Sequence, residues 1–287
     1  MTQYKLGKDE FYGFVEAVMR DNEFYAPAQG DKTKKVQRSQ FSKITHPNQI
    51  LTHIIPTYFP AKYFFFDKKE KIFGFEENNI VDPVIEVPQR VIFGLRRCDL
   101  NGILHQDIVF LDKDNPDPFY QARREVTTLI GLHCEKGDEY CFCNSVDNQD
   151  FFDLMFYEKE NYFAVEVGSE KGEEFMNTCK AYFSKHDDFI TDKDKEIENT
   201  FSLNHTEIKD IYDHKDWEEL SRTCVSCGAC NTLCPNCHCF TISDDVNFNL
   251  KTGVRVRTPA SCQLRSFTRV AGDFVFRKER VERFKHR

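Results

Sequence analysis

Hydrophobic residues recur at helical spacing near the start of the chain. The positions that share one face are Phe11, Phe14, Val15 and Val18. This spacing predicts an amphipathic helix over roughly the first 20 residues, with its apolar stripe in the core. Three short β-type runs follow at 50–57, 62–66 and 80–87, and prolines lie in or beside them. Such runs indicate the short strands of a mixed sheet.

Two continuous apolar runs, 91–95 and 127–132, are typical of buried strands. Asp99 follows the first run and can cap a helix that carries apolar residues at helical spacing. A strand, a helix and a second strand in this order predict two parallel strands in one sheet. The remaining predicted elements are a hairpin over 153–157 and 162–167, helices over 173–183 and 193–201, and a polar helical segment before Cys224.

One short segment carries the most specific chemistry in the chain. Cys224-Val-Ser-Cys227-Gly-Ala-Cys230-Asn-Thr-Leu-Cys234-Pro235 has the spacing C-x2-C-x2-C-x3-C-P, which binds 4Fe–4S clusters in bacterial ferredoxins. The first three thiolates can occupy three corners of one cluster, whereas the fourth cysteine of such a run ligates a second cluster. The candidates for the missing fourth ligand are Cys237, Cys239, Cys262 or a cysteine of a second run.

Zinc is the alternative metal for this segment. Cys224 and Cys227, followed by Cys237-His238-Cys239, could supply a tetrahedral set of nitrogen and sulfur ligands. That assignment leaves Cys230 and Cys234 without a role. The complete spacing therefore favours an iron–sulfur cluster over zinc.

Four further cysteines lie upstream of this run. Cys98 ends the first buried run, Cys134 follows the second, and Cys141 and Cys143 come shortly after. If the two strands are parallel neighbours, Cys98 and Cys134 emerge at the same carboxyl edge of the sheet, where α/β folds place binding sites. The four thiolates could then converge. A buried free cysteine is also a common small apolar residue, so the spacing alone leaves a metal site and a core role open.

The 12 cysteines of this 287-residue chain are not expected to form disulfides. The chain starts without the charged-then-apolar layout of a signal peptide, and no run approaches the roughly 18 apolar residues of a membrane span. We therefore expect a soluble, cytoplasmic protein whose thiols are reduced and available for metal.

Charge is spread unevenly along the chain. The net charge is −8, yet residues 251–287 carry 11 Lys and Arg against 3 Asp and Glu. An acidic body weakens the attraction of such a basic end for nucleic acid, so a solvated helix or a docking surface for an acidic partner is favoured. No dinucleotide fingerprint or phosphate-binding loop occurs, and any flavin or nicotinamide chemistry is therefore expected on another subunit.

A wider set of motifs is more specific than the cysteine run alone. The motifs are Gly94-Leu-Arg-Arg-Cys-Asp-Leu100, Pro116-Asp-Pro-Phe-Tyr-Gln-Ala-Arg-Arg-Glu125, Cys141-Phe-Cys-Asn-Ser145, Cys234-Pro-Asn-Cys-His-Cys-Phe240, Ser261-Cys-Gln263, Phe267-Thr-Arg-Val-Ala-Gly272 and Arg283-Phe-Lys-His-Arg287. From about residue 60 to residue 287 the chain resembles the iron–sulfur subunits of the anaerobic sulfite reductase family. The same family includes the β subunit of cytosolic nickel–iron hydrogenases, the sulfhydrogenases.

The resemblance implies an iron–sulfur electron-transfer subunit of an anaerobic multisubunit oxidoreductase, without substrate chemistry of its own. It implies that the chain receives electrons from a flavin- and NAD(P)H-binding subunit or a ferredoxin-linked subunit. It also implies that the chain passes them to a catalytic subunit, which is first a sirohaem sulfite reductase and alternatively a nickel–iron hydrogenase. A zinc-stabilised nucleic-acid-binding module is the alternative from another class.

The resemblance also assigns roles to the cysteines. It makes Cys224, Cys227, Cys230 and Cys234 cluster ligands, and it includes Cys98, Cys134, Cys141 and Cys143 in the family pattern. Family members continue beyond the stretch at Arg287 into a second C-x2-C-x2-C-x3-C-P run. A truncated chain, thiolates from a partner, or the loss of one cluster would each explain its absence here. We therefore expect between one and three 4Fe–4S clusters.

Together these patterns predict an α+β chain with two domains. Residues 1–216 are expected to form a mixed-sheet N-terminal domain that could hold the upstream cysteine site. Residues 217–287 are expected to form a ferredoxin-like α-helical iron–sulfur domain, with the polar stretch before Cys224 as the boundary.

Overall fold

The computed structural model describes residues 3–30, 39–53, 57–112, 114–185, 190–204 and 208–286. The chain divides into two compact units. The first unit comprises Met1–Lys62 and Glu86–Leu203, and the second unit comprises Tyr63–Ile85 and Asn204–Arg287. The second unit therefore includes a segment far upstream of the single boundary predicted near residue 217.

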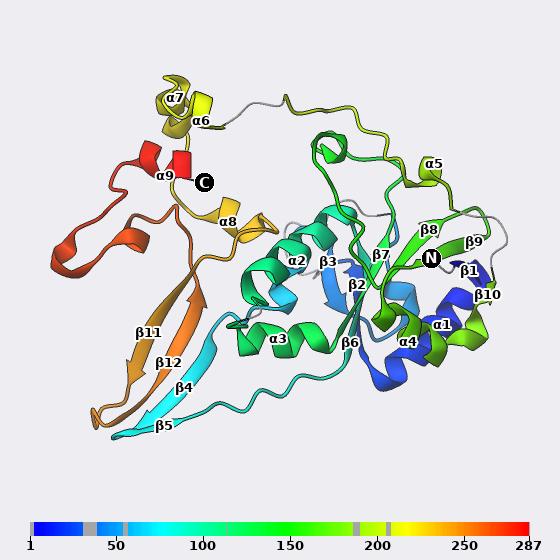
Figure 1. Cartoon of the computed structure of the whole chain (residues 1–287), viewed down its shortest axis with the longest axis horizontal. Coiled ribbons are helices and arrows are strands. Elements are labelled where there is room, and N and C mark those ends of the chain that lie inside the picture. Colours follow the sequence, from blue (N-terminus) through cyan, green and yellow to red (C-terminus); the bar gives the residue numbers. More distant parts are fainter. Residues whose placement is uncertain are drawn as a thin grey trace. The chain divides into compact units, whose positions relative to one another are not determined.

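A mixed sheet forms the centre of the first unit (Figure 1). Among the described residues its strands are β1 (Gln3–Gly7), β2 (Glu23–Ala28), β3 (Gln40–Lys43), β6 (Arg90–Leu95), β7 (Thr127–Leu132), β8 (Leu154–Glu158), β9 (Tyr162–Val167) and β10 (Ser184–Lys185). They lie in the order β10-β1-β9-β8-β7-β6-β2-β3. β2, β6, β7 and β8 run parallel, and β8 and β9 form an antiparallel hairpin. The predicted parallel pair and the predicted hairpin are both confirmed.

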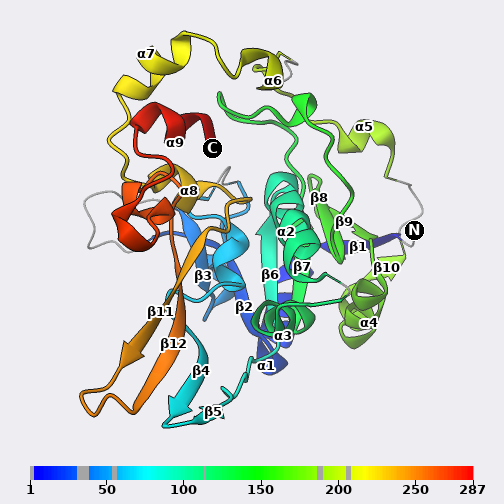
Figure 2. The ribbon, with the colours of Figure 1, turned by 60° about the vertical axis from the view of Figure 1, so that its left-hand side comes forward.

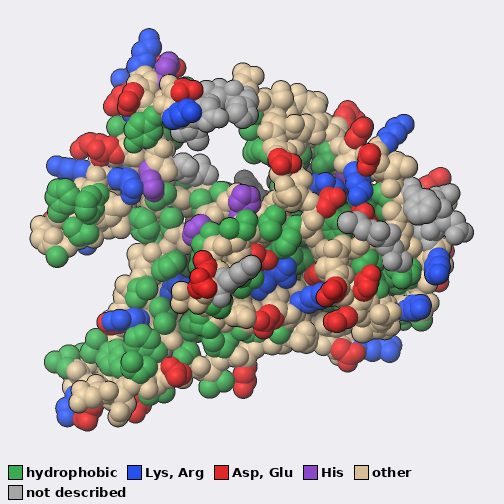
Figure 3. Space-filling view, in the orientation of Figure 1, with side chains coloured by type: hydrophobic (Ala, Val, Ile, Leu, Met, Phe, Trp, Pro, Cys, Tyr) green, Lys and Arg blue, Asp and Glu red, His purple; other side chains and the backbone are tan. Residues whose placement is uncertain are grey.

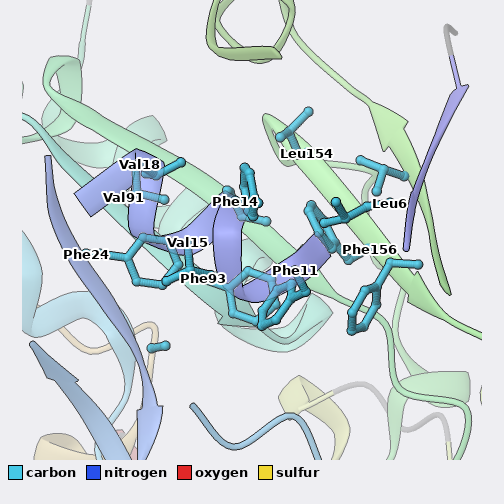
Figure 4. Close-up of a cluster of buried hydrophobic side chains, with 14 of the residues drawn as sticks. Leu6, Phe11, Phe14, Val15, Val18, Phe24, Val91, Phe93, Leu154 and Phe156 are labelled. Atoms are coloured by element: carbon cyan, nitrogen blue, oxygen red, sulfur yellow. The ribbon is translucent and has the colours of Figure 1, made fainter. Parts of the chain in front are cut away.

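Helix α1 (Lys8–Asp21) packs on one face of this sheet (Figure 4). Its buried residues are Phe11, Phe14, Val15 and Val18, the four that the spacing predicts. Phe14 is fully buried, and its ring contacts those of Phe156 on β8 and Phe183. Helix α4 (Glu170–Thr178) contributes Met176 to the same core.

Helix α2 (Arg97–Phe110) connects β6 to β7 and covers the opposite face of the sheet. Ile130 and Leu132 of β7 belong to the core beneath α1, whereas a Cβ on Gly131, between them, would lie 3.1 Å from the Leu100 Cδ1 atom of α2. Successive residues of a strand point to opposite faces, so α1 and α2 sandwich the sheet. Helix α3 (Pro118–Glu125) follows α2 and packs on it through the stacked rings of Phe110 and Tyr120.

Several predicted elements differ in the structure. Ala61–Phe64 is a short 3₁₀ helix where a strand over 62–66 is predicted. Within 80–87 the only strand is the end of β5 (Asn79–Val81), because Pro83 and Pro88 lack the N–H that a ladder needs. The predicted strand at 50–57 is irregular where it is described, and its residues 54–56 lie outside the described residues. The two predicted helices are shorter, since α4 ends at Thr178 and α5 spans only Asp192–Lys195.

An antiparallel sheet forms part of the second unit (Figure 2). Its described strands, in the order β11-β12-β4-β5, are β11 (Phe240–Val246), β12 (Thr252–Pro259), β4 (Glu70–Glu76) and β5. The described α-helices of this unit are α6 (Ile208–Ile211), α7 (Asp216–Arg222), α8 (Ala229–Leu233) and α9 (Arg280–His286), and Arg265–Thr268 and Ala271–Asp273 are short 3₁₀ helices. α7 is the predicted polar helix before Cys224, whereas the β11–β12 hairpin is not predicted from the sequence pattern.

A buried ion pair joins β4 to β12. Arg257 Nε donates to Glu70 Oε2 over 2.8 Å, and both side chains are buried. The pairing of β4 with β12 explains why the upstream segment Tyr63–Ile85 belongs to the second unit. Within this unit the chain therefore combines α and β structure rather than helices alone.

β11 is an edge strand whose residues are all exposed. Ile242 and Val246 are half exposed, and Phe248, at the turn of the hairpin, is fully exposed. Figure 3 shows hydrophobic side chains gathered on this part of the second unit. In the part of the chain that the structure describes, no helix has both the length and the apolar character needed to cross a bilayer.

We expect Phe14→Ala to destabilise the first unit by about 3–5 kcal/mol, because the substitution leaves a cavity between α1 and the sheet. The matched control is Tyr12→Ala, since the Tyr12 side chain is half exposed on the same helix. Urea unfolding followed by circular dichroism measures both variants. Equal losses of stability in the two variants would contradict the packing described for α1.

Candidate cysteine sites

The carboxyl ends of β6 and β7 position the first two upstream cysteines. Cys98 is the second residue of α2, which begins two residues after β6 ends, and Cys134 lies two residues after β7 ends. The two strands are parallel neighbours, so both cysteines emerge at the same edge of the sheet. The predicted placement of this pair is confirmed.

A folded loop carries the other two upstream cysteines. Its backbone is tied to a distant segment, because Gly137 N donates to Glu198 O over 2.9 Å and Glu198 N donates to Glu135 O over 2.9 Å. Gly137 is required here, since a Cβ at this position would lie 2.6 Å from the Cys141 Cβ atom. The side chain of Asn148 then donates to Cys143 O over 3.1 Å. These contacts fix the loop that presents Cys141 and Cys143.

The upstream cysteines influence one another electrostatically. Desolvation raises the pKa of the Cys98 thiol well above its usual range, although part of its surface is accessible. The further causes are the Asp99 carboxylate and the thiols of Cys134, Cys143 and Cys141. Desolvation also raises the pKa of Cys141 to about 11. The Cys98 thiol thus lies within electrostatic range of the other three upstream thiols.

Two cavities adjoin the upstream cysteines. One, of about 530 Å³, is lined by Cys134 together with Arg96 and His133. The other, of about 430 Å³, is lined by Cys143 together with Arg97 and Lys195. Arg97 Nη1 pairs with Asp150 Oδ1 over 3.0 Å, while its Nε and Nη2 atoms are buried without a hydrogen-bond partner among the described residues.

The downstream cysteine run forms a tight loop and a short helix. Ser226 has a φ of 53° and Gly228 a φ of 78°, so the backbone turns twice between Cys224 and Cys230. Glycine suits the second turn, since a Cβ at Gly228 would also lie 2.9 Å from the Ser261 Cβ atom. Ser226 N donates to Cys224 Sγ over 3.4 Å. α8 then begins at Ala229 and ends immediately before Cys234.

The amide of Asn231 lies among three sulfurs of the second unit. Asn231 is buried, and its Nδ2 atom donates to Cys237 Sγ over 3.3 Å and to Cys262 Sγ over 3.4 Å. Cys230 Sγ lies 3.6 Å from the Asn231 Oδ1 atom, which also accepts from Ser261 Oγ over 2.7 Å. The structure therefore brings Cys230, Cys237 and Cys262 together around one amide group.

Arg283 connects the cysteine segments of the second unit. Its buried guanidinium donates to Gln263 O over 3.0 Å and to Ser226 Oγ over 3.3 Å. Gln263 in turn donates to Cys262 Sγ over 3.7 Å. This arginine belongs to the basic end of the chain, where the sequence indicates only a solvated or docking surface.

No three His, Cys, Asp or Glu side chains of the described residues converge in a way that suits a single metal ion. A cubane cluster has a different requirement, because its thiolates surround four irons and each binds its own corner. The structure places Cys98 and Cys134 at one edge of the sheet, and it places Cys230 near Cys237 and Cys262. Asn231 and Arg283 were not predicted as functional residues, and only the position of Asn231 between two cysteines of the run could have indicated it.

We expect Asn231→Ala to destabilise the second unit by about 1–3 kcal/mol, because it leaves buried polar partners without hydrogen bonds. Asn236→Ala is the matched control, since Asn236 lies in the same segment and is exposed. Thermal unfolding with iron release as the probe compares the two. An Asn231→Ala protein as stable as the control would show that the amide does not organise these sulfurs.

Comparisons with known proteins identify the cofactor and the family of the chain. A family model described as a 4Fe-4S dicluster domain matches residues 223–287. The sulfhydrogenase 2 subunit beta of Pyrococcus furiosus is 30% identical over 304 residues, which cover 100% of this chain and 87% of that protein. No solved structure matches. The predicted iron–sulfur cofactor and the predicted family are thereby confirmed: the chain binds 4Fe–4S clusters and belongs to the family of the sulfhydrogenase beta subunits.

Proposed function

We propose that this chain relays single electrons through 4Fe–4S clusters inside a multisubunit hydrogenase. The observation that carries the proposal is the ferredoxin-type cysteine run within a matched 4Fe-4S dicluster domain, in a chain similar over its whole length to a sulfhydrogenase beta subunit. Cluster-bearing subunits of this kind move electrons and make no bond to a substrate.

Two cysteine sets would hold the clusters. In the second unit, Cys224, Cys227 and Cys230 are proposed as three ligands of one cluster, with Cys234 directed to another, as in two-cluster ferredoxins. The loop geometry supports this assignment, because two left-handed turns let three sulfurs project from a short segment. A bound cluster supplies a one-electron redox centre.

The upstream set is proposed as a further cluster site in the first unit. Its donors are Cys98, Cys134, Cys141 and Cys143. The parallel pairing of β6 with β7, which places Cys98 and Cys134 at one edge of the sheet, supports this assignment. The buried Nε and Nη2 atoms of Arg97, which have no hydrogen-bond partner among the described residues, also suit a site beside Cys143 that would be anionic with a cluster bound.

The partners are proposed from the family. We infer a flavin- and nicotinamide-binding subunit that exchanges electrons with the chain, and a nickel–iron catalytic subunit. The hydrogenase is placed before the sirohaem sulfite reductase because the matched relative is named as part of a sulfhydrogenase. The sulfite reductase remains the second candidate, since the quoted motifs are shared across the family.

We expect Cys98→Ala to lower the iron content by about four per chain, the content of one cubane. Cys179→Ala is the control, because Cys179 is a buried cysteine in the core beneath α1 and should leave the iron unchanged. Anaerobic purification with iron and acid-labile sulfide analysis gives the counts. An unchanged iron content in Cys98→Ala would remove the upstream cluster from the proposal.

The identity of the catalytic partner has its own test. We expect the complex that co-purifies with the tagged chain to contain nickel, measured by elemental analysis, and to oxidise hydrogen with a viologen dye as acceptor. The same preparation is examined for the visible absorption of sirohaem. Sirohaem without nickel would assign the chain to a sulfite reductase instead.

A further inference from the structure

Arg96 is the buried residue that joins the strand ends at the upstream cysteine site. It is 3% exposed and lies directly between β6 and α2. Its Nη1 atom donates to Leu132 O over 2.9 Å and to His133 O over 3.3 Å, and its Nη2 atom donates to Thr52 O over 2.5 Å. The guanidinium is thus held against the end of β7, where the chain continues to Cys134.

The same guanidinium lies close to Cys134. Arg96 and Cys134 line one cavity of about 530 Å³, and Arg96 Nη1 donates to the carbonyl of His133, the residue before Cys134. Arginine stays protonated in proteins, so the site contains a fixed positive charge whether or not iron is present.

A fixed cation beside an iron–sulfur cluster affects the two oxidation states differently. Reduction adds one negative charge to a centre already made anionic by its thiolates, so a neighbouring cation stabilises the reduced state more. Net charge and hydrogen bonds to the sulfurs are among the factors that set cluster potentials. A low dielectric strengthens the effect, because a buried charge is poorly screened.

We infer that Arg96 is a positioning residue that raises the reduction potential of the cluster held by Cys98, Cys134, Cys141 and Cys143. The inference rests on the proposed function, since it requires a cluster at this site. Arg96 is held at the end of β7 by the carbonyls of Leu132 and of His133, the residue before Cys134. The buried carboxylate of Asp99 also lies beside Arg96, because Arg96 N donates to Asp99 Oδ2 over 3.3 Å.

The test is a redox titration of the full-length chain, purified anaerobically and followed by electron paramagnetic resonance. Cys98→Ser first identifies the upstream signal as the one that disappears. We then expect Arg96→Gln to keep the wild-type iron content and to lower the equilibrium constant for reduction of that signal about tenfold, which is 59 mV for one electron. The other signals should not shift.

Two further variants separate charge from structural support. Arg96→Lys keeps the positive charge but loses the planar guanidinium. The reduction potential of its upstream cluster should therefore differ less from the wild-type value than the potential measured for Arg96→Gln does. Arg124→Gln removes a largely buried arginine of α3 that pairs over 3.0 Å with Asp107, near the far end of α2, and should leave the potential unchanged. An Arg96→Gln protein with full iron and an unshifted signal would overturn the inference.

If Arg96→Gln loses the upstream cluster, its potential cannot be measured, and the Arg96→Lys variant then tests the inference. An Arg96→Lys protein that keeps the cluster near its wild-type potential supports the effect of charge. An Arg96→Lys protein that also loses the cluster shows that Arg96 has a structural role only, and this result overturns the inference. Failure of the proposed function is recognised separately: the wild-type protein and Cys98→Ser would then contain equal iron and show the same signals, before any Arg96 variant is measured.

Discussion

Parallel pairing of β6 and β7 is the constraint on which the upstream cysteine site depends. Parallel neighbours end at the same edge of a sheet, whereas antiparallel neighbours would place Cys98 and Cys134 at opposite edges. The connection through α2 makes the parallel arrangement possible, and Arg96 holds the two strand ends together through the Leu132 carbonyl. The placement of Cys98 and Cys134 at one edge of the sheet is thus a consequence of the sheet topology.

Short-range patterns predicted the elements that pack locally. The stripe of Phe11, Phe14, Val15 and Val18 identified α1, and two apolar runs around α2 identified the parallel pair. Long-range contacts could not be predicted in this way. The loop of Cys141 and Cys143 is fixed by pairing with Glu198, and no local pattern in either segment indicates its partner. The grouping of Cys237 and Cys262 around Asn231 depends on the same kind of contact.

The basic end of the chain shows that the number of charged residues in a segment does not by itself give the charge of the surface. Residues 251–287 are rich in arginine, yet Arg257 is buried against Glu70, and Arg283 is buried among backbone carbonyls and Ser226. These arginines act inside the second unit, where they connect strands and cysteine segments. The surface is therefore less positive than the composition of this segment indicates, which reduces the case for a nucleic-acid-binding role.

The ion pair between β4 and β12 also has a consequence for biosynthesis. Glu70 and Arg257 are 187 residues apart in the chain. At the usual rates of translation, β12 is synthesised on the order of 10–40 s after β4. During that interval the backbone edge of β4 and the carboxylate of Glu70 have no β12 to pair with. All described strands of the first unit are synthesised before β11 and β12. The sheet of the first unit can therefore form first, and the second unit is completed last.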